Sequence, residues 1–132
     1  MLLLFMNLKN IFKRFVILDL ILLVLLIASM FLESEEINNI NQSFSQPTDM
    51  MLILSLILIV VWLVSLYYLY NFKKNGRELY FFVTVFTLFL SLLSGELASS
   101  ATSYVFDGLG WAITGAILTL LYFSPIKKEF GK

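Results

Sequence analysis

Long apolar stretches alternate with short polar ones along the chain. Four apolar stretches reach or approach the roughly 20 residues that a membrane-spanning helix needs: residues 15–32, 50–70, 79–95 and 103–123. The second is the clearest because it carries no charge, and the fourth reaches this length only by including Asp107. The pattern predicts an all-α protein, a single membrane domain over residues 1–132 built as an integral membrane four-helix bundle.

The polar stretches between these helices read as connections. Residues 33–49 carry acids, amides and Pro47, and we expect an outer loop there. Asn75-Gly76 predicts a tight turn between the second and third helices. Ser124-Pro125 ends the fourth helix, because proline disfavours helical geometry in the residue before it.

All nine Lys and Arg residues fall in three clusters, which four spans would place on one side of the membrane. The clusters are Lys9, Lys13 and Arg14; Lys73, Lys74 and Arg77; and Lys127, Lys128 and Lys132. The opposite side carries acids and no cation. Because cytoplasmic loops are enriched in Lys and Arg, we expect both termini in the cytoplasm (N-in, C-in).

Composition excludes several kinds of chemistry. The hydrophobic fraction is 60%, above the roughly 45–50% of soluble domains, so the lipid bilayer is the expected surrounding. The chain has no cysteine and no histidine, which excludes a thiol nucleophile, the commonest general base and histidine-ligated zinc. It has no Gly-rich phosphate loop and no basic patch for nucleic acid. We therefore expect no enzyme, no cofactor, no metal site and no nucleic-acid partner.

The N-terminal residues allow several interpretations. Residues 9–29 also fit a signal peptide, but the apolar run is long and Ala28-Ser29-Met30 is a poor cleavage site, so we favour a retained span. Met1 and Met6 are both plausible starts. The first dozen residues are expected to form an interfacial helix with Lys9 and Lys13 on its wet face.

Asp19 is the acid that lies well inside an apolar span, and intramembrane acids are candidate functional residues. Its functional interpretation is a proton- or cation-binding carboxylate. Asp19 also follows Arg14 by five residues, about 7.5 Å along a helix. We favour the structural interpretation, in which Asp19 lies near the inner interface and pairs with Arg14.

A second candidate ion or proton site lies around Glu96 and Asp107, which bracket a hydroxyl-rich segment that includes Ser99, Ser100 and Ser103. Oxygen-rich clusters of this kind suit hard cations. We favour the alternative, a solvated outer loop whose hydroxyls cap the adjoining helix ends. Asp107 lies four residues before Trp111, so one helix face can present both.

Small residues recur along the fourth span. The predicted packing positions are Gly108, Ala112, Gly115 and Ala116. Small side chains let helices approach closely, and we expect this face inside the bundle rather than at a dimer interface.

Several short segments carry a resemblance to a known group. They are residues 75–80, Thr84, Gly95, the serine-rich connection after it, residues 115–118, and Tyr122-Phe123-Ser124-Pro125 with its basic tail. The second half of the chain thereby resembles a group of small, functionally uncharacterised four-span proteins of bacterial inner membranes. In that group an aromatic residue often precedes the glycine of the central turn, where this chain has Asn75. The resemblance implies a multi-pass architecture and a bacterial inner membrane, and no activity.

Small multidrug-resistance transporters offer an architectural comparison, because they too are short four-span chains with an acid in the first span. Their acid is a glutamate, their loops are shorter and their charge bias is small, whereas the bias here is total. We therefore expect a non-enzymatic protein that acts by contact within the bilayer, as an accessory, regulatory or immunity-type protein, with another membrane protein or a second copy as partner. The alternative is a small proton- or cation-coupled transporter that uses Asp19, and the orientation of Asp19 discriminates between the two.

Overall fold

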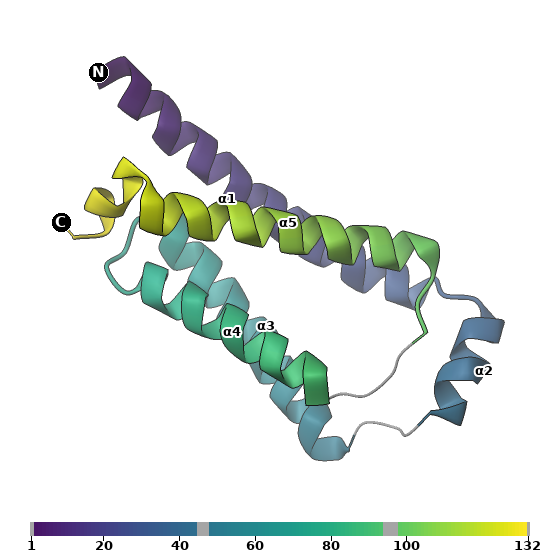
Figure 1. Cartoon of the computed structure of the whole chain (residues 1–132). Coiled ribbons are helices and arrows are strands. Elements are labelled where there is room, and N and C mark those ends of the chain that lie inside the picture. The colour runs from purple at the N-terminus through teal and green to yellow at the C-terminus, as the bar shows by residue number, and fades with distance from the viewer. Residues whose placement is uncertain (1, 45–47, 94–97, 132) are drawn as a thin grey trace.

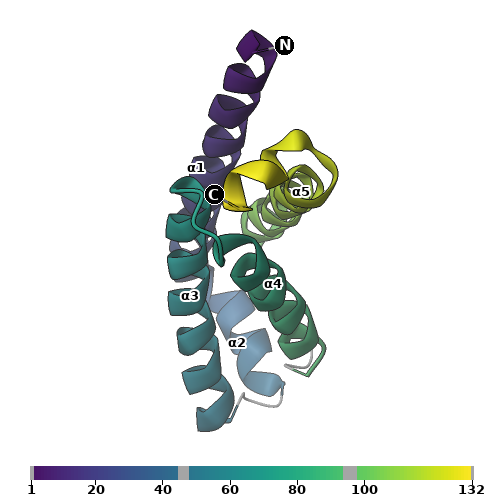
Figure 2. The same cartoon turned by 90° about the vertical axis from the view of Figure 1, so that its left-hand side faces the viewer.

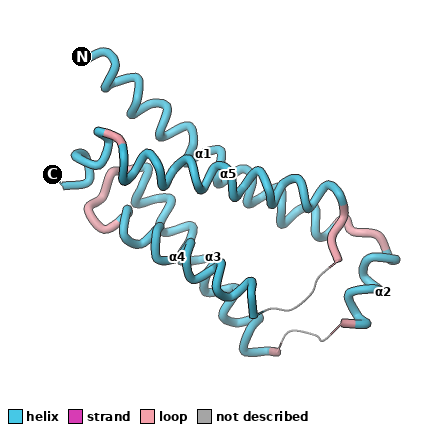
Figure 3. Tube along the Cα trace, viewed as in Figure 1, coloured by secondary structure: helices cyan, strands magenta, loops and turns pink. Residues whose placement is uncertain are grey.

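The computed structural model describes residues 2–44, 48–93 and 98–131, and these residues are predominantly helical (Figure 1; Figure 3). Four helices are long and apolar enough to cross a membrane. They are α1 (Leu2–Phe31), α3 (Asp49–Tyr70), α4 (Gly76–Leu93) and α5 (Ala101–Phe123). Two short elements complete the chain, α2 (Glu35–Ser43) and the 3₁₀ helix η1 (Pro125–Gly131). The predicted all-α class with four spans is confirmed.

The long helices form two antiparallel pairs. α1 packs mainly against α5 and α3 mainly against α4, whereas α4 and α5 contact each other little. The pairs meet at the end that holds both chain termini and diverge toward the end that holds α2 (Figure 1; Figure 2). We call the first the basic end, for Lys9, Lys13, Lys73, Lys74, Arg77, Lys127 and Lys128, and the second the acidic end, for Glu33, Glu35, Glu36 and Asp49.

Most of the buried apolar side chains lie toward the basic end. Phe12, Leu69 and Ile117 are fully buried there, and η1 adds Ile126 and Phe130 to the same cluster. The ring centroids of Phe12 and Phe130 lie 6.0 Å apart, and those of Phe72 and Phe130 lie 5.3 Å apart. We call Phe12, Phe72, Ile126 and Phe130 the aromatic plug. The ion pair between Lys9 Nζ and Glu129 Oε2, at 2.7 Å, fastens η1 to α1 beside this plug.

The turn between α3 and α4 contains Phe72 of the aromatic plug and sets the start of α4. α3 ends with the amide of Lys73 donating to the carbonyl of Tyr68 at 2.9 Å and the amide of Phe72 donating to Leu69 at 3.0 Å. This is a Schellman motif, in which Phe72 takes the left-handed position (φ 52°) that glycine usually fills. Gly76 follows at the predicted Asn-Gly turn, where a Cβ would meet the backbone and Cβ of Tyr68 at 3.0 Å. Glycine there lets α4 start directly against α3.

α2 occupies part of the stretch that the sequence predicted to be a loop. The hydroxyl of Ser34 caps it by accepting from the amide of Ile37, and Glu35 and Glu36 lie in its first turn, where the helix dipole favours acids. Asn41 then exchanges two hydrogen bonds with the backbone of Ala98, at 3.0 and 2.8 Å. α2 therefore ties the α1–α3 connection to the chain segment that leads into α5.

α1 is longer than predicted. It runs without a break from Leu2 to Phe31, so the first dozen residues continue the spanning helix and do not form a separate interfacial helix. Phe12, predicted to lie outside the first span, is buried in the plug. This extension shifts the middle of the helix toward Asp19.

The prediction that the small residues of α5 face the bundle interior is wrong for the single chain. Gly108, Ala112 and Gly115 are exposed, and Ala116 is only partly buried. A Cβ on Gly108 or Gly115 would meet nothing within 4 Å. The face that does pack inward carries larger residues, namely Ser103, Thr114, Ile117 and Leu121. The physical reason is that α5 packs through Ile117 and Leu121 into the apolar cluster of the basic end.

Candidate functional site

Asp19 is buried among the four long helices, with 3% of its surface exposed. Its Oδ2 accepts hydrogen bonds from the hydroxyl of Tyr80 at 2.9 Å and from the indole N–H of Trp62 at 3.2 Å. Its Oδ1 has a longer contact of 3.5 Å with the hydroxyl of Thr114. One side chain from each of α3, α4 and α5 thus converges on a carboxylate of α1.

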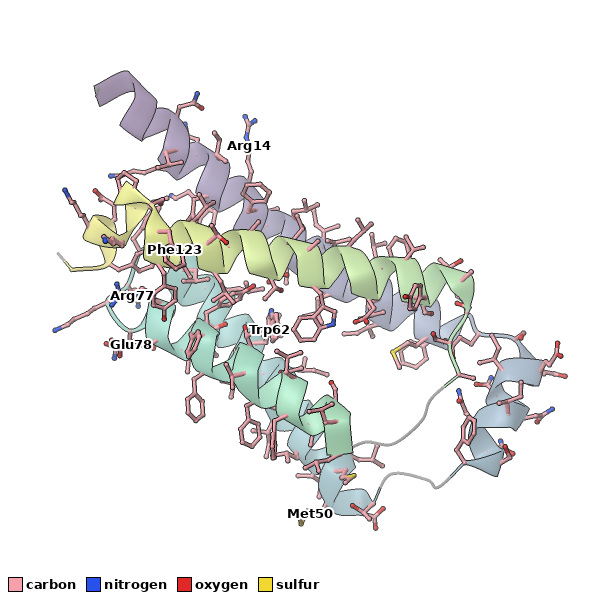
Figure 4. The ribbon with its side chains drawn as sticks, viewed as in Figure 1. Arg14, Met50, Trp62, Arg77, Glu78 and Phe123 are labelled. Atoms are coloured by element: carbon pink, nitrogen blue, oxygen red, sulfur yellow. The ribbon has the colours of Figure 1, made fainter. Side chains whose placement is uncertain are left out.

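The three partners are themselves positioned by packing. The rings of Trp62 and Tyr80 contact edge to face, with centroids 5.5 Å apart. The Tyr80 hydroxyl also lies 3.3 Å from the hydroxyl of Thr114, so its single proton has two acceptors in reach. Trp62 lies between the two helix pairs, about midway along the bundle (Figure 4). The carboxylate is therefore held in one orientation by hydrogen-bond donors rather than by a cation.

The expected pairing of Asp19 with Arg14 is wrong. Arg14 is exposed and points away from the bundle (Figure 4). Asp19 lies in the middle of the candidate span Asn7–Phe31, not at its edge. The five-residue spacing misled because it places the two side chains on different faces of α1, and because α1 continues well before Arg14. Asp19 therefore faces the interior of the bundle and not the inner membrane interface. This orientation distinguishes the transporter alternative from the contact protein.

A cavity of about 260 Å³ extends from Asp19 toward the acidic end. Its walls come from all four long helices and are mainly leucine, isoleucine and aromatic side chains, including Trp62, Phe106 and Trp111. The polar groups that line it are Asp19, Ser55, Thr87, Ser91, Asp107 and Thr114. No Lys or Arg is among its lining residues in the described part of the chain. Asp19 and Leu26 both line it, so it extends over about 10 Å of α1.

The second candidate ion site is only partly described. Glu96 lies outside the described residues. Asp107 is exposed and lines the cavity together with Trp111, so one face of α5 presents both, as predicted. The cavity thus connects Asp19 with Asp107, a relation that the sequence did not indicate.

The structural interpretation of the hydroxyl-rich segment predicted that its hydroxyls cap helix ends, and Ser100 does so. Ser100 caps α5, its hydroxyl accepting from the amide of Ser103 at 3.1 Å. Ser103 is buried and turned toward α1, where its hydroxyl lies 2.9 Å from that of Ser29 and donates to Glu33 at 3.2 Å. These contacts join α1 to α5 at the acidic end and leave Ser100 and Ser103 with structural roles.

Sequence reasoning missed the three partners of Asp19. A signal existed for Trp62, because tryptophans in membrane proteins concentrate at the interfaces and this one lies in the interior of a span. Tyr80 lies at the start of the third predicted span, a position where tyrosines usually lie at the membrane interface, yet it is fully buried. Thr114 gave no signal, since isolated threonines in spanning helices usually bond to their own backbone.

Comparison with known proteins adds no relative: no protein family, no curated protein and no solved structure matches the chain.

Proposed function

We propose that this chain is a small carrier of a bacterial inner membrane, with both termini in the cytoplasm, in which Asp19 binds the proton or cation that is moved. The observation that carries the proposal is the position of Asp19, buried in the interior at the base of a cavity. The charge distribution supports the orientation, because the basic end holds the cations described in all three clusters.

The energetic argument concerns why an acid is kept at this depth. An aspartate at the centre of a spanning helix costs about 2.5–3.5 kcal/mol on insertion scales. Hydrogen bonds from Trp62, Tyr80 and Thr114 offset part of that cost. A polar bridge between helices needs no charge, however, since Ser, Thr, Asn and Gln also bond across helices in membranes. A carboxylate that lines a cavity adds what those residues lack, a group that can bind and release a cation.

The asymmetry of the bundle supports a carrier rather than an open channel. The cavity reaches Asp19 from the acidic end, whereas the aromatic plug and the Lys9–Glu129 ion pair close the basic end. A carrier must expose its site to one side at a time, and a cavity on the acidic side of Asp19 supports an outward-facing state for the proposed orientation. The contact-protein hypothesis has its own support in the exposed small residues of α5, Gly108, Ala112 and Gly115, which would let another helix approach closely. They supply no group that binds a ligand, and they leave the burial of a carboxylate beside a cavity without an explanation.

The proposal is tested by recording charge movement. The purified chain is reconstituted in proteoliposomes on a solid-supported membrane, and the current is measured after a pH step at constant salt and after exchange of Na⁺ for K⁺. We expect a transient current for at least one step, which Asp19→Asn abolishes because the amide keeps the shape but cannot bind a proton or cation in the same way. Asp19→Glu, which keeps the carboxylate, should retain a reduced current.

Asp49→Asn is the matched control, since it makes the same chemical change at an exposed acid on the first turn of α3. Its current should equal that of the unmodified chain. Absence of current in the unmodified chain for both steps, or an undiminished current in Asp19→Asn, contradicts the proposal. Size-exclusion profiles of all variants confirm that equal amounts of folded protein are compared.

A further inference from the structure

We infer that the cavity that extends from Asp19 toward the acidic end binds a small organic cation with apolar substituents, of the tetraalkylammonium kind. This inference rests on the proposed function, because it names the class of cation that the Asp19 site takes. It is carried by the size, the walls and the charge of the cavity, which together fit one class of ligand better than others.

The size of the cavity sets the first limit. At about 260 Å³ it lies below the roughly 300–1,000 Å³ that drug-sized ligands occupy, so it suits a compact molecule. It is nevertheless far larger than one bare ion needs. A small organic molecule fits both bounds.

The walls exclude a tightly held inorganic ion. Hard cations such as Ca²⁺ take six to eight oxygen ligands at short distance. Here the polar lining groups are spread over the four helices, and most of the wall is apolar, with aliphatic side chains such as Leu22, Leu58 and Leu90 beside the aromatic ones. No group of three or more carboxylates with metal-binding spacing occurs in the described part of the chain. Apolar walls instead favour a ligand that brings its own hydrocarbon surface.

The charge of the cavity favours a cation as this ligand. Both titratable groups that line it are acids, Asp19 at the base and Asp107 toward the acidic end. Trp62 and Trp111 add two indole rings, and indole faces attract organic cations more strongly than other aromatic rings do. A cation would compensate the negative charge of Asp19, which no Lys or Arg among the lining residues does, whereas a neutral or anionic ligand would not.

The hydrogen bonds of Asp19 leave one oxygen available for such a ligand. Oδ2 already accepts from Tyr80 and Trp62 at 2.9 and 3.2 Å. Oδ1 has only the long contact of 3.5 Å with Thr114, whose hydroxyl can turn to the Tyr80 hydroxyl 3.3 Å away. The carboxylate is thus oriented through one oxygen, while the other can face a positive charge without breaking the stronger bonds.

The chain carries its own reporter of binding, because its two tryptophans, Trp62 and Trp111, both line the cavity. The test is a titration of the purified chain in lipid nanodiscs with tetramethyl-, tetraethyl-, tetrapropyl- and tetrabutylammonium, followed by intrinsic tryptophan fluorescence. We expect a saturable change with at least one of these ions, strongest for a middle member of the series. Asp19→Asn should weaken the affinity at least tenfold, and 3,3-diethylpentane, the uncharged analogue of tetraethylammonium, should not compete.

A second pair of variants tests the cavity without touching the carboxylate. Gly110→Leu places a large side chain in the cavity wall, at a position where a Cβ meets nothing within 4 Å. It should weaken binding at least tenfold. Gly108→Leu is the matched control on the same helix, since Gly108 is exposed and does not line the cavity. Its affinity should equal that of the unmodified chain.

The outcomes separate this inference from the proposed function. A lack of saturable fluorescence change, equal affinity in Asp19→Asn, or equal binding of the uncharged analogue overturns the organic-cation site. If currents driven by pH or Na⁺ persist in that case, the carrier proposal still stands. Saturable binding that depends on Asp19 and Gly110, without any current, supports the site and contradicts the carrier.

Discussion

Tyr80 shows how a single side chain serves both the fold and the candidate site. It is fully buried, packs against Trp62 and donates to Oδ2 of Asp19 at 2.9 Å. A buried acceptor that loses its donor keeps its desolvation penalty, which amounts to about 1–3 kcal/mol for one group. The hydroxyl of Tyr80 therefore stabilises Asp19 where it lies, and the ring stabilises the packing between α4 and α3.

This role predicts the effect of deleting one oxygen. Tyr80→Phe keeps the ring and removes a donor to the carboxylate, so it should destabilise the protein by about 1–3 kcal/mol. Tyr104→Phe makes the same change at a side chain that is 74% exposed and should have little effect. The measurement is thermal unfolding in detergent at matched concentration. Equal unfolding temperatures for the two variants would show that the Tyr80–Asp19 bond contributes nothing to stability.

At the scale of single residues, the sequence singled out Asp19 and Asp107 as candidates but did not predict their surroundings. An acid within an apolar run can be recognised in the sequence because it interrupts the apolar pattern. Its depth and its partners are not, because they depend on where α1 starts and on how α3, α4 and α5 are rotated about their axes. Asp19 and Thr114 are far apart in the chain, and only tertiary packing brings their oxygens to 3.5 Å.

Among the elements, α5 is the clearest example of what periodicity leaves undetermined. Its apolar length predicts a span correctly, because the bilayer thickness sets the number of residues required. Small residues at intervals of four favoured one face as the packed face, yet the packed face carries Ile117 and Leu121. Since α5 is apolar on nearly all sides, composition alone does not distinguish the face toward lipid from the face toward α1.

α2 was missed for a different reason. Its sequence is polar and short, which is typical of a loop, and the signals for a helix are the cap Ser34 and the two glutamates after it. The contacts of Asn41 with Ala98 join it to a segment far along the chain, and these cannot be read from local sequence.

The rotation of α5 is tested by one substitution at two positions. Leu121→Ala should destabilise the protein by roughly 2–5 kcal/mol, because Leu121 is fully buried and the change leaves a void. Leu109→Ala removes the same atoms from a side chain that is 49% exposed and should have little effect. Thermal unfolding in detergent distinguishes the two. The reverse order would place the small-residue face inside the bundle after all.

For the whole molecule, the distribution of packing matters more than any single helix. The two helix pairs are joined at the basic end by the apolar cluster and by η1, and they separate toward the acidic end, where the cavity lies (Figure 1). Movement of one pair relative to the other would change access to Asp19 from either end. The α3–α4 contact and the α1–α5 contact, both extensive, would survive such a movement.

The central proposal, that a cavity gives access to Asp19 from outside the cytoplasm, can be tested directly because the chain has no cysteine. Ile59→Cys places a thiol on the cavity wall about one turn from Trp62. Val60→Cys places one at the same depth on the exposed, lipid-facing side of α3. Spheroplasts carrying each variant are treated with a membrane-impermeant, cationic thiol reagent, and modification is quantified by mass spectrometry.

We predict that Ile59→Cys is modified in intact spheroplasts and that Val60→Cys is not, because a thiol in lipid does not ionise and meets no reagent. Lys73→Cys, in the turn at the basic end, should react only after the membrane is permeabilised. Failure of Ile59→Cys to react, or its reaction only after permeabilisation, would contradict the account.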